Sequence, residues 1–435
     1  MFDEQLELAR LLSGRLPSPD GIEAIRLRRL RALLSYAWRY VPYYRRLFAS
    51  AGLVPGDIRS VGDLRRLPVS GRDLLRAAGP DRISREVDPA ACRVMYSSGS
   101  SGKPWPVYRT AAEDRLRRAV ELRSMIAAGI RPRDRVVTLG PVVAAGAKQT
   151  LRRFGIFPTC FVSPLLPVEQ QARQLRALRP DVFWVYPTAL RALLHCVGAL
   201  SRLIQPRMIV TSAEPLDEIL RHKLSSDRPV ELRNFYGSVE VGRIGWECAA
   251  GEGLHINTDC SILELEEEGA VPGAGQSVVV TNLNSRVSPY IRFRLGDLCE
   301  FIERPCSCGS PLPLMKPPVG RQWDVIRLPS GKLISPWALN SILRSVEGLL
   351  QFRLVQKRVD LLVLQLQLAA EPHGGLLDSL NARLGQQIGE PVTLRVEIVD
   401  RFVNGALKFR AFLSELEDSG GQKQEAGARC RAPAS

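Results

Sequence analysis

The stretch Tyr-Ser-Ser-Gly-Ser-Ser-Gly-Lys-Pro at residues 96–104 is the most informative part of the chain. Its hydroxyls can donate hydrogen bonds, its glycines let backbone amides converge, and its lysine adds positive charge. We therefore expect a nucleotide phosphate to bind there, although a flexible surface turn is the alternative. The pattern matches neither the Walker loop nor the dinucleotide-binding glycine motif. The predicted phosphate-binding residues are Ser97, Ser98, Gly99, Ser100, Ser101, Gly102 and Lys103.

Composition indicates an ordinary globular protein. The chain has 435 residues, enough for two or three domains, and no apolar run is long enough to form a membrane helix. Its acidic start lacks the features of a signal peptide, so we expect a cytoplasmic protein. The net charge is +15, but the arginines are dispersed and follow no nucleic-acid motif. We predict a solvated arginine-rich surface, no nucleic acid or membrane partner, and compatibility with a polyanionic cofactor or an acidic carrier protein.

The middle of the chain alternates short β-rich runs with helical stretches. Strands are predicted at 135–139, 182–186 and 208–211, and helices at 167–178, 188–203 and 215–225. This alternation predicts α/β layers with parallel strands. Residues 21–50 predict one long helix that ends in a docking turn, 111–129 predict another helix, and 260–303 predict a β-subdomain.

The C-terminal quarter predicts a separate unit. A hairpin at 328–332, a helix near 337–347, a strand pair over 351–369, a helix over 375–388 and a strand over 392–399 suggest a small mobile α+β lid. We expect an N-terminal ATP- and carboxylate-binding domain at 1–320, the lid at 321–417 and a disordered tail at 418–435.

Four further motifs carry chemistry. Asn-Phe-Tyr-Gly-Ser-Val-Glu at 234–240 leaves a strand through a Tyr-Gly turn and supplies an aromatic ring, a hydroxyl and a carboxylate, which suit a purine and Mg²⁺. Tyr-Ile-Arg-Phe-Arg-Leu-Gly-Asp at 290–297 ends in a carboxylate that can accept two ribose hydroxyls. Gly-Arg-Gln-Trp-Asp at 320–324 lies where the two domains join, and 404–410 places a lone lysine after a glycine turn.

Together these motifs resemble the adenylate-forming superfamily, which includes acyl- and aryl-CoA synthetases. Within it, the chain is most similar to the phenylacetate-CoA ligase-like branch, as residues 33–44, 64–68 and 211–215 also indicate. The similarity runs from about residue 25 to 415. Two positions depart from the family pattern: Trp323 stands in the hinge motif, and two residues separate Gly405 from Lys408.

The resemblance implies roles for individual residues. Glu240 would hold Mg²⁺, Asp297 would bind ribose, and Lys103 and Lys408 would act in adenylation together with Glu240. The remaining ATP-binding residues would be Ala213, Glu214, Tyr236, Gly237, Ser238 and Arg321. Candidates for the substrate pocket are Tyr186, Phe235, Gly140 and Ala213, although ordinary core packing explains them equally well.

The implied activity is an ATP-dependent, AMP-forming ligase. It would adenylate a carboxylic acid, expected to be aromatic, and pass the acyl group to coenzyme A. Transfer to an acyl carrier protein or to an amine is one alternative, and a catalytically impaired nucleotide-binding partner protein is another. The sequence leaves open the acid, the acceptor and the oligomeric state, with a homodimer among the alternatives.

Four soft donors are grouped in the sequence. Cys248, His255, Cys306 and Cys308 offer three thiolates and one imidazole, the donor set of a closed tetrahedral zinc site. Unrelated buried thiols are the alternative. The resemblance favours zinc, because members of this branch carry a similar structural metal.

Overall fold

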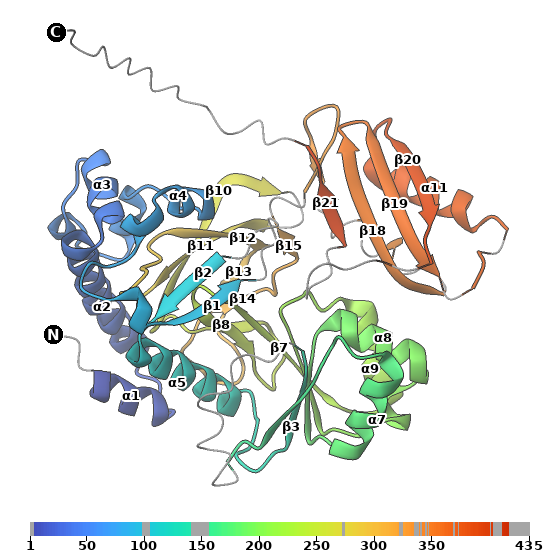
Figure 1. Cartoon of the computed structure of the whole chain (residues 1–435), viewed down its shortest axis with the longest axis horizontal. Helices are drawn as coiled ribbons and strands as arrows, with labels where there is room; N and C mark the ends of the chain where they lie inside the picture. The colour runs from blue at the N-terminus through green and yellow to red at the C-terminus, as the bar shows by residue number, and fades with distance from the viewer. Residues whose placement is uncertain are drawn as a thin grey trace.

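The computed structural model describes residues 4–97, 105–140, 156–271, 275–321, 325–334, 339, 342–343, 346, 348–368, 370–372, 374–400, 402 and 411–416, apart from the side chains of 4, 268, 269 and 321. Figure 1 shows a large N-terminal body and a C-terminal body built on its own sheet. Within the described ranges, no helix has the length and apolar character needed to cross a bilayer.

A nine-stranded sheet runs through the large body, in the order β13-β14-β9-β8-β7-β6-β5-β3-β4. The five strands from β7 to β4 are parallel, and those from β7 to β13 pair antiparallel. The three strands predicted from the sequence are confirmed as β3, β5 and β6. The members are β3 (Val136–Leu139), β4 (Thr159–Val162), β5 (Val182–Val185), β6 (Met208–Ser212), β7 (Glu231–Ser238), β8 (Gly242–Glu247), β9 (Leu254–Ile256), β13 (Phe301–Ile302) and β14 (Leu314–Met315).

Helices cover both faces of the parallel strands. Helices α7 (Val168–Leu178), α8 (Pro187–Val197) and α9 (Glu218–Asp227) lie together over one face (Figure 1), where their leucines bury the apolar side chains of the strands. Helix α5 (Ala111–Ala127) packs on the other face. Two predicted helices were too long. Helix α8 stops before Gly198, which has φ +76°, and α9 starts only after Asp217, whose side chain caps it.

The predicted β-subdomain is confirmed as an antiparallel sheet with the order β10-β11-β12-β15. Its strands are β10 (Ser261–Val271), β11 (Gly275–Asn282), β12 (Phe293–Cys299) and β15 (Gly320–Arg321). A hairpin of β1 (Arg93–Ser97) and β2 (Trp105–Arg109) carries the predicted phosphate loop at its tip, and residues 98–104 lie outside the described ranges.

The predicted long N-terminal helix is confirmed, but the docking turn predicted after it is wrong. Helix α2 (Pro19–Tyr40) ends at Val41, whose backbone is extended before Pro42, and a second helix, α3 (Pro42–Ser50), replaces the docking turn. A residue before proline avoids the helical region, so the break has a local cause. Both helices pack against the second sheet, together with the short helix α4 (Arg72–Ala77).

The C-terminal body confirms much of the predicted order. It has a hairpin of β16 (Ile326–Arg327) and β17 (Leu333–Ile334), and a four-stranded sheet with the order β20-β19-β18-β21 under helix α11 (Leu376–Ile388). The strands are β18 (Leu349–Arg358), β19 (Leu361–Leu368), β20 (Thr393–Ile398) and β21 (Phe412–Ser414). Strand β21 was not predicted. Of the predicted helix near 337–347, only single residues and one pair are described, and the predicted tail lies outside the described residues.

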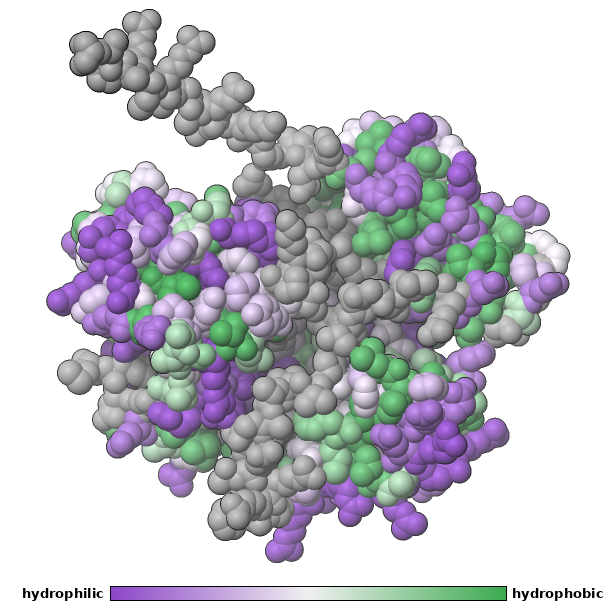
Figure 2. Space-filling model, in the orientation of Figure 1, coloured by the Kyte–Doolittle hydropathy of each residue, from purple (hydrophilic) through white to green (hydrophobic). Residues whose placement is uncertain are grey.

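The prediction of a wholly solvated arginine surface needs correction. Hydrophilic side chains do cover much of the face in Figure 2. Several arginines, however, are buried and act inside the fold: Arg29, Arg82, Arg109, Arg123 and Arg233. The dispersed arginines of the sequence are therefore in part structural.

One buried carboxylate joins three helices. Asp259 is fully buried and accepts from Arg123 at 2.6 and 2.8 Å and from Arg10 at 2.6 Å, while Arg29 donates to its carbonyl at 2.6 Å. Burial alone would raise the pKa of Asp259, but the arginines outweigh burial and hold that pKa well below its usual range. The network ties α1 (Glu4–Leu12), α2 and α5 to the turn before β10.

Replacing Asp259 with Asn should cost about 3 kcal/mol of unfolding free energy at pH 7, since buried arginines lose their counter-ion. Because the folded pKa is depressed, this stabilisation exists above the unfolded pKa of about 3.9 and is lost as pH falls toward the folded pKa. Urea unfolding should show that the difference in unfolding free energy between parent and variant is smaller at pH 3 than at pH 7. The control Asp73→Asn removes an exposed partner of Arg76 and should change little. Equal midpoints for parent and Asp259→Asn at pH 7 would contradict the prediction.

Candidate functional site

The candidate site lies at the carboxyl ends of β6 and β7, where the sheet changes from parallel to antiparallel. This is the edge at which open α/β sheets bind ligands. Ser212 pairs with Phe235, so Ala213 and Tyr236 follow as neighbours on adjacent strands. Ala213 has φ +70°, a left-handed conformation that is uncommon for residues other than glycine and that clusters at functional sites.

Two residues far apart in the sequence form the ribose-binding candidate. The Tyr236 hydroxyl donates to the Asp297 carboxylate at 2.7 Å. Asp297 lies in β12, and its backbone pairs across the ladder with that of Arg321 in β15, another predicted ATP-binding residue. The side chain of Arg321 lies outside the described residues. Tyr236 and Gly237 lie within strand β7 and not in a turn, which corrects that part of the motif's interpretation.

Glu240 occupies the turn between β7 and β8. Its side chain is almost fully buried, and the Arg72 guanidinium donates to Oε1 at 2.9 Å. The turn is tight because Gly237 and Gly242 approach closely: a Cβ on Gly237 would lie 2.3 Å from the Gly242 carbonyl oxygen. Nearby, Ser238 Oγ accepts from the Val241 amide at 3.2 Å. The predicted metal-binding carboxylate is thus held in a specific turn.

The described part of the phosphate loop ends at Ser97. Its hydroxyl is buried and makes no hydrogen bond to any residue that the structure describes. The remaining predicted phosphate-binding residues, and Lys408, lie outside the described ranges. The loop's supporting hairpin is fixed by Arg109 of β2, which donates to the Val239 carbonyl beside Glu240.

The structure describes only part of the predicted substrate pocket. Gly140 lies against the ring of half-buried Tyr186, since a Cβ there would come within 3.6 Å of Cζ. Burial and the charge of Glu214 raise the pKa of Tyr186 to about 12, so its hydroxyl stays protonated. The carboxylate of Glu214 accepts from the Thr188 amide and hydroxyl, both at 2.9 Å, and so holds the first turn of α8.

Phe235 does not lie where the substrate prediction placed it. Only 1% of it is exposed, and it packs 5.0 Å from the Trp184 ring with the Arg243 guanidinium 4.6 Å from its centroid. Successive residues of a strand face opposite sides, so Tyr236 turns to Asp297 while Phe235 turns to the core. Core packing is the correct interpretation for this residue.

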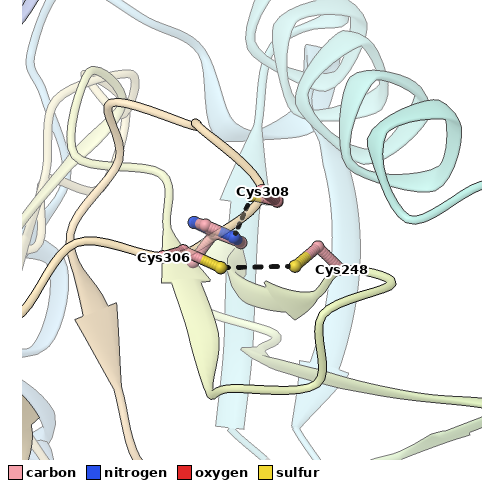
Figure 3. Close-up of side chains that lie close together, drawn as sticks. Cys248, Cys306 and Cys308 are labelled. Atoms are coloured by element: carbon pink, nitrogen blue, oxygen red, sulfur yellow. Dashed lines mark hydrogen bonds between the residues drawn. The ribbon is translucent and has the colours of Figure 1, made fainter.

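Figure 3 shows the predicted metal-binding residues together. One ligand atom from each of Cys248, His255, Cys306 and Cys308 lies within 4.8 Å of the other three. Cys248 Sγ is 3.6 Å from Cys306 Sγ, and Cys308 Sγ is 3.3 Å from His255 Nε2. Thiolates bound tetrahedrally to zinc lie about 3.8 Å apart, so the spacing fits that ion.

The protonation of His255 also suits a metal ligand. Nδ1 is 3.3 Å from the Leu312 carbonyl, which can only accept, so Nδ1 carries the proton and Nε2 faces Cys308 with its lone pair. Burial lowers the pKa of His255, which favours the neutral ring. The cluster joins the end of β8 to β9 and to the segment between β13 and β14.

Sequence reasoning missed the residues that support Glu240. Arg72 reaches it across 168 positions, and Asn282 Nδ2 donates to its carbonyl at 3.4 Å. The local pattern Ser-Gly-Arg before a short helix gives no signal of a partner so far away.

Gly237→Ala should destabilise the protein by about 2 kcal/mol, because the added methyl must push the hairpin strands apart. Thermal unfolding followed by circular dichroism checks this. Gly56→Ala is the control, since a Cβ at Gly56 meets no atom within 4 Å. A Gly237→Ala protein as stable as the control would refute the tight turn.

Comparisons with known proteins agree with this geometry, although no protein-family model matches the chain. A phenylacetate-coenzyme A ligase of Thermus thermophilus is 26% identical over 362 residues, covering 78% of this chain and 79% of the relative. The enzyme of the same name from Escherichia coli is 28% identical over 308 residues, covering 66% and 68%.

Solved structures show the same fold. A 2-hydroxyisobutyryl-CoA ligase in its postadenylation state, bound to an adenylate, superposes with a TM-score of 0.74 at 21% identity, covering 92% of this chain and 90% of that one. In its thioesterification state the score is 0.62. The sequence motifs, the site and these relatives agree: the chain is similar to the phenylacetate-CoA ligases and shares the fold of adenylate-forming CoA ligases.

Proposed function

We propose that this protein is an ATP-dependent, AMP-forming ligase that converts a carboxylic acid to its coenzyme A thioester. The observation that carries the proposal is the contact of Tyr236 with Asp297 at the carboxyl edge of the sheet, with Glu240 in the turn after the same strand and Arg109 of the phosphate-loop hairpin bound beside it. The relatives named phenylacetate-coenzyme A ligase support the same activity.

The reaction has two steps. A carboxylate oxygen of the acid attacks the α-phosphorus of ATP and pyrophosphate leaves; the coenzyme A sulfur then attacks the acyl carbon and AMP leaves. Asp297 would accept from the ribose hydroxyls while Tyr236 fixes its orientation. Glu240 would hold Mg²⁺, which supplies charge neutralisation at the phosphates. Lys103 and Lys408 are proposed to neutralise charge as well.

The acid is proposed to be aromatic, with Tyr186 and Gly140 beside it. This choice rests on the relatives' names and on the half-buried phenol. Residues 321–417 are proposed to act as a mobile lid over the site. A cytoplasmic location stays a prediction.

Amide formation is the second candidate. A fumarate–(S)-2,3-diaminopropanoate ligase from Enterobacter agglomerans is 24% identical over 142 residues, which is 31% of this chain. An amine acceptor or a carrier protein would leave the first step unchanged, so the acceptor assay separates these alternatives.

The parent protein should catalyse ATP–pyrophosphate exchange with at least one acid from a panel of aryl and aliphatic carboxylates. Asp297→Asn and Lys408→Ala should each slow exchange at least about a hundredfold, because charged contacts to the nucleotide are lost. Lys357→Ala is the control, since Lys357 pairs with Glu415 at the surface.

Thioester formation with coenzyme A then identifies the acceptor. Exchange without thioester would indicate a carrier protein or an amine. If the parent exchanges pyrophosphate with none of the acids, the catalytically impaired partner protein is favoured.

We also propose that Cys248, His255, Cys306 and Cys308 hold a structural zinc ion. All four positions of a tetrahedral site would come from the protein, leaving none for a substrate. Such a site would stabilise the sheet edge and take no part in adenylation.

Elemental analysis of protein purified without chelators should give about one zinc per chain. Cys306→Ser should lose the zinc and unfold at lower temperature, because the sheet edge loses its cross-link. Cys196→Ser changes an exposed cysteine outside the cluster and should retain the metal. A parent protein that contains no zinc would rule the site out.

A further inference from the structure

The carboxylate proposed to bind Mg²⁺ already contacts a cation. Only 2% of Glu240 is exposed, and its Oε1 accepts from the Arg72 guanidinium at 2.9 Å. A buried carboxylate is costly without a compensating positive charge, so Arg72 supplies that charge in the protein alone.

Arg72 is held close to the nucleotide-binding residues by its backbone. Ser70, two residues earlier, pairs with β12: its amide donates to the Arg292 carbonyl at 2.7 Å, and its carbonyl accepts from the Arg294 amide at 2.8 Å. The same strand carries Asp297 three residues later. The position of Arg72 is therefore fixed relative to the ribose-binding carboxylate.

Glu240 is anchored from behind. Asn282 donates to its carbonyl at 3.4 Å, and Arg109 donates to the preceding carbonyl of Val239. Arg72, by contrast, has a long side chain that is 19% exposed. Arg72 is therefore the more exposed member of the pair.

We propose that Arg72 is a built-in counter-ion that competes with the divalent cation for Glu240. Resting on the function proposed above, this assigns Arg72 as a positioning residue of the metal-binding carboxylate. In the protein alone, Arg72 neutralises Glu240 and keeps its affinity for free Mg²⁺ low. The cation then binds effectively only together with the triphosphate, whose negative charges offset the repulsion from Arg72.

Direct binding of Mn²⁺, measured by electron paramagnetic resonance on full-length zinc-loaded protein without nucleotide, tests the proposal. Arg72→Met should bind Mn²⁺ at least about tenfold more tightly than the parent, because a unit charge next to the cation is removed. Arg72→Lys keeps the charge and should stay near the parent. In Arg72→Met/Glu240→Gln the tight site should disappear, which shows that the ion counted is the one on Glu240.

The matched control is Arg76→Met. It removes the same charge one turn later in α4, where the arginine pairs with Asp73 instead of Glu240, and Mn²⁺ affinity should not change. Should Arg72→Met fold poorly, Arg72→Gln is measured in its place. A Mg²⁺-dependent rise in melting temperature that is larger in the Arg72 variant than in the parent is the second expected readout.

Unchanged or weaker Mn²⁺ binding in folded Arg72 variants would overturn the proposal. The failure of the proposed function would look different, because it is read from pyrophosphate exchange by the parent protein. A parent that exchanges pyrophosphate while its Arg72 variants show no gain in Mn²⁺ affinity would leave the ligase function standing and remove the role of Arg72.

Discussion

Strand β7 imposes the constraint on which the site depends. It pairs parallel to β6 on one edge and antiparallel to β8 on the other, so the sheet changes direction at this strand. The close approach of Gly237 and Gly242 leaves no room for a side chain between the strands. Because the turn is so tight, Glu240 emerges at the same sheet edge as Ala213 and Tyr236, and the proposed nucleotide site forms there.

Arginines neutralise the buried carboxylates of the large body. Asp259 and Glu240 are both buried carboxylates, and each is neutralised by arginine from a helix distant in sequence. The consequences differ. Asp259 contacts several arginines that are themselves buried or half-buried, so its network is static and joins helices. Glu240 contacts Arg72 and lies in the turn after the strand that carries Tyr236.

The four proposed metal-binding residues lie at the antiparallel side of the large sheet. There the strands β9, β13 and β14 have only two or three residues each, so few backbone hydrogen bonds hold them. A metal ion at Cys248, His255, Cys306 and Cys308 would add bonds between segments that pack weakly alone. The cluster lies next to the hydrophobic core, because Trp246 belongs to that core and its ring is 4.8 Å from the ring of His255.

The sequence by itself determined the α/β alternation, the β-subdomain, the motif order and the identities of the four candidate metal donors. These features are local: periodicity and glycine or proline punctuation act over a few residues. Tertiary structure alone decided that Phe235 is core while Tyr236 meets Asp297, and that Arg72 reaches Glu240. Such contacts join residues 61 to 168 positions apart, and their geometry depends on how sheets and helices pack, which no local pattern encodes.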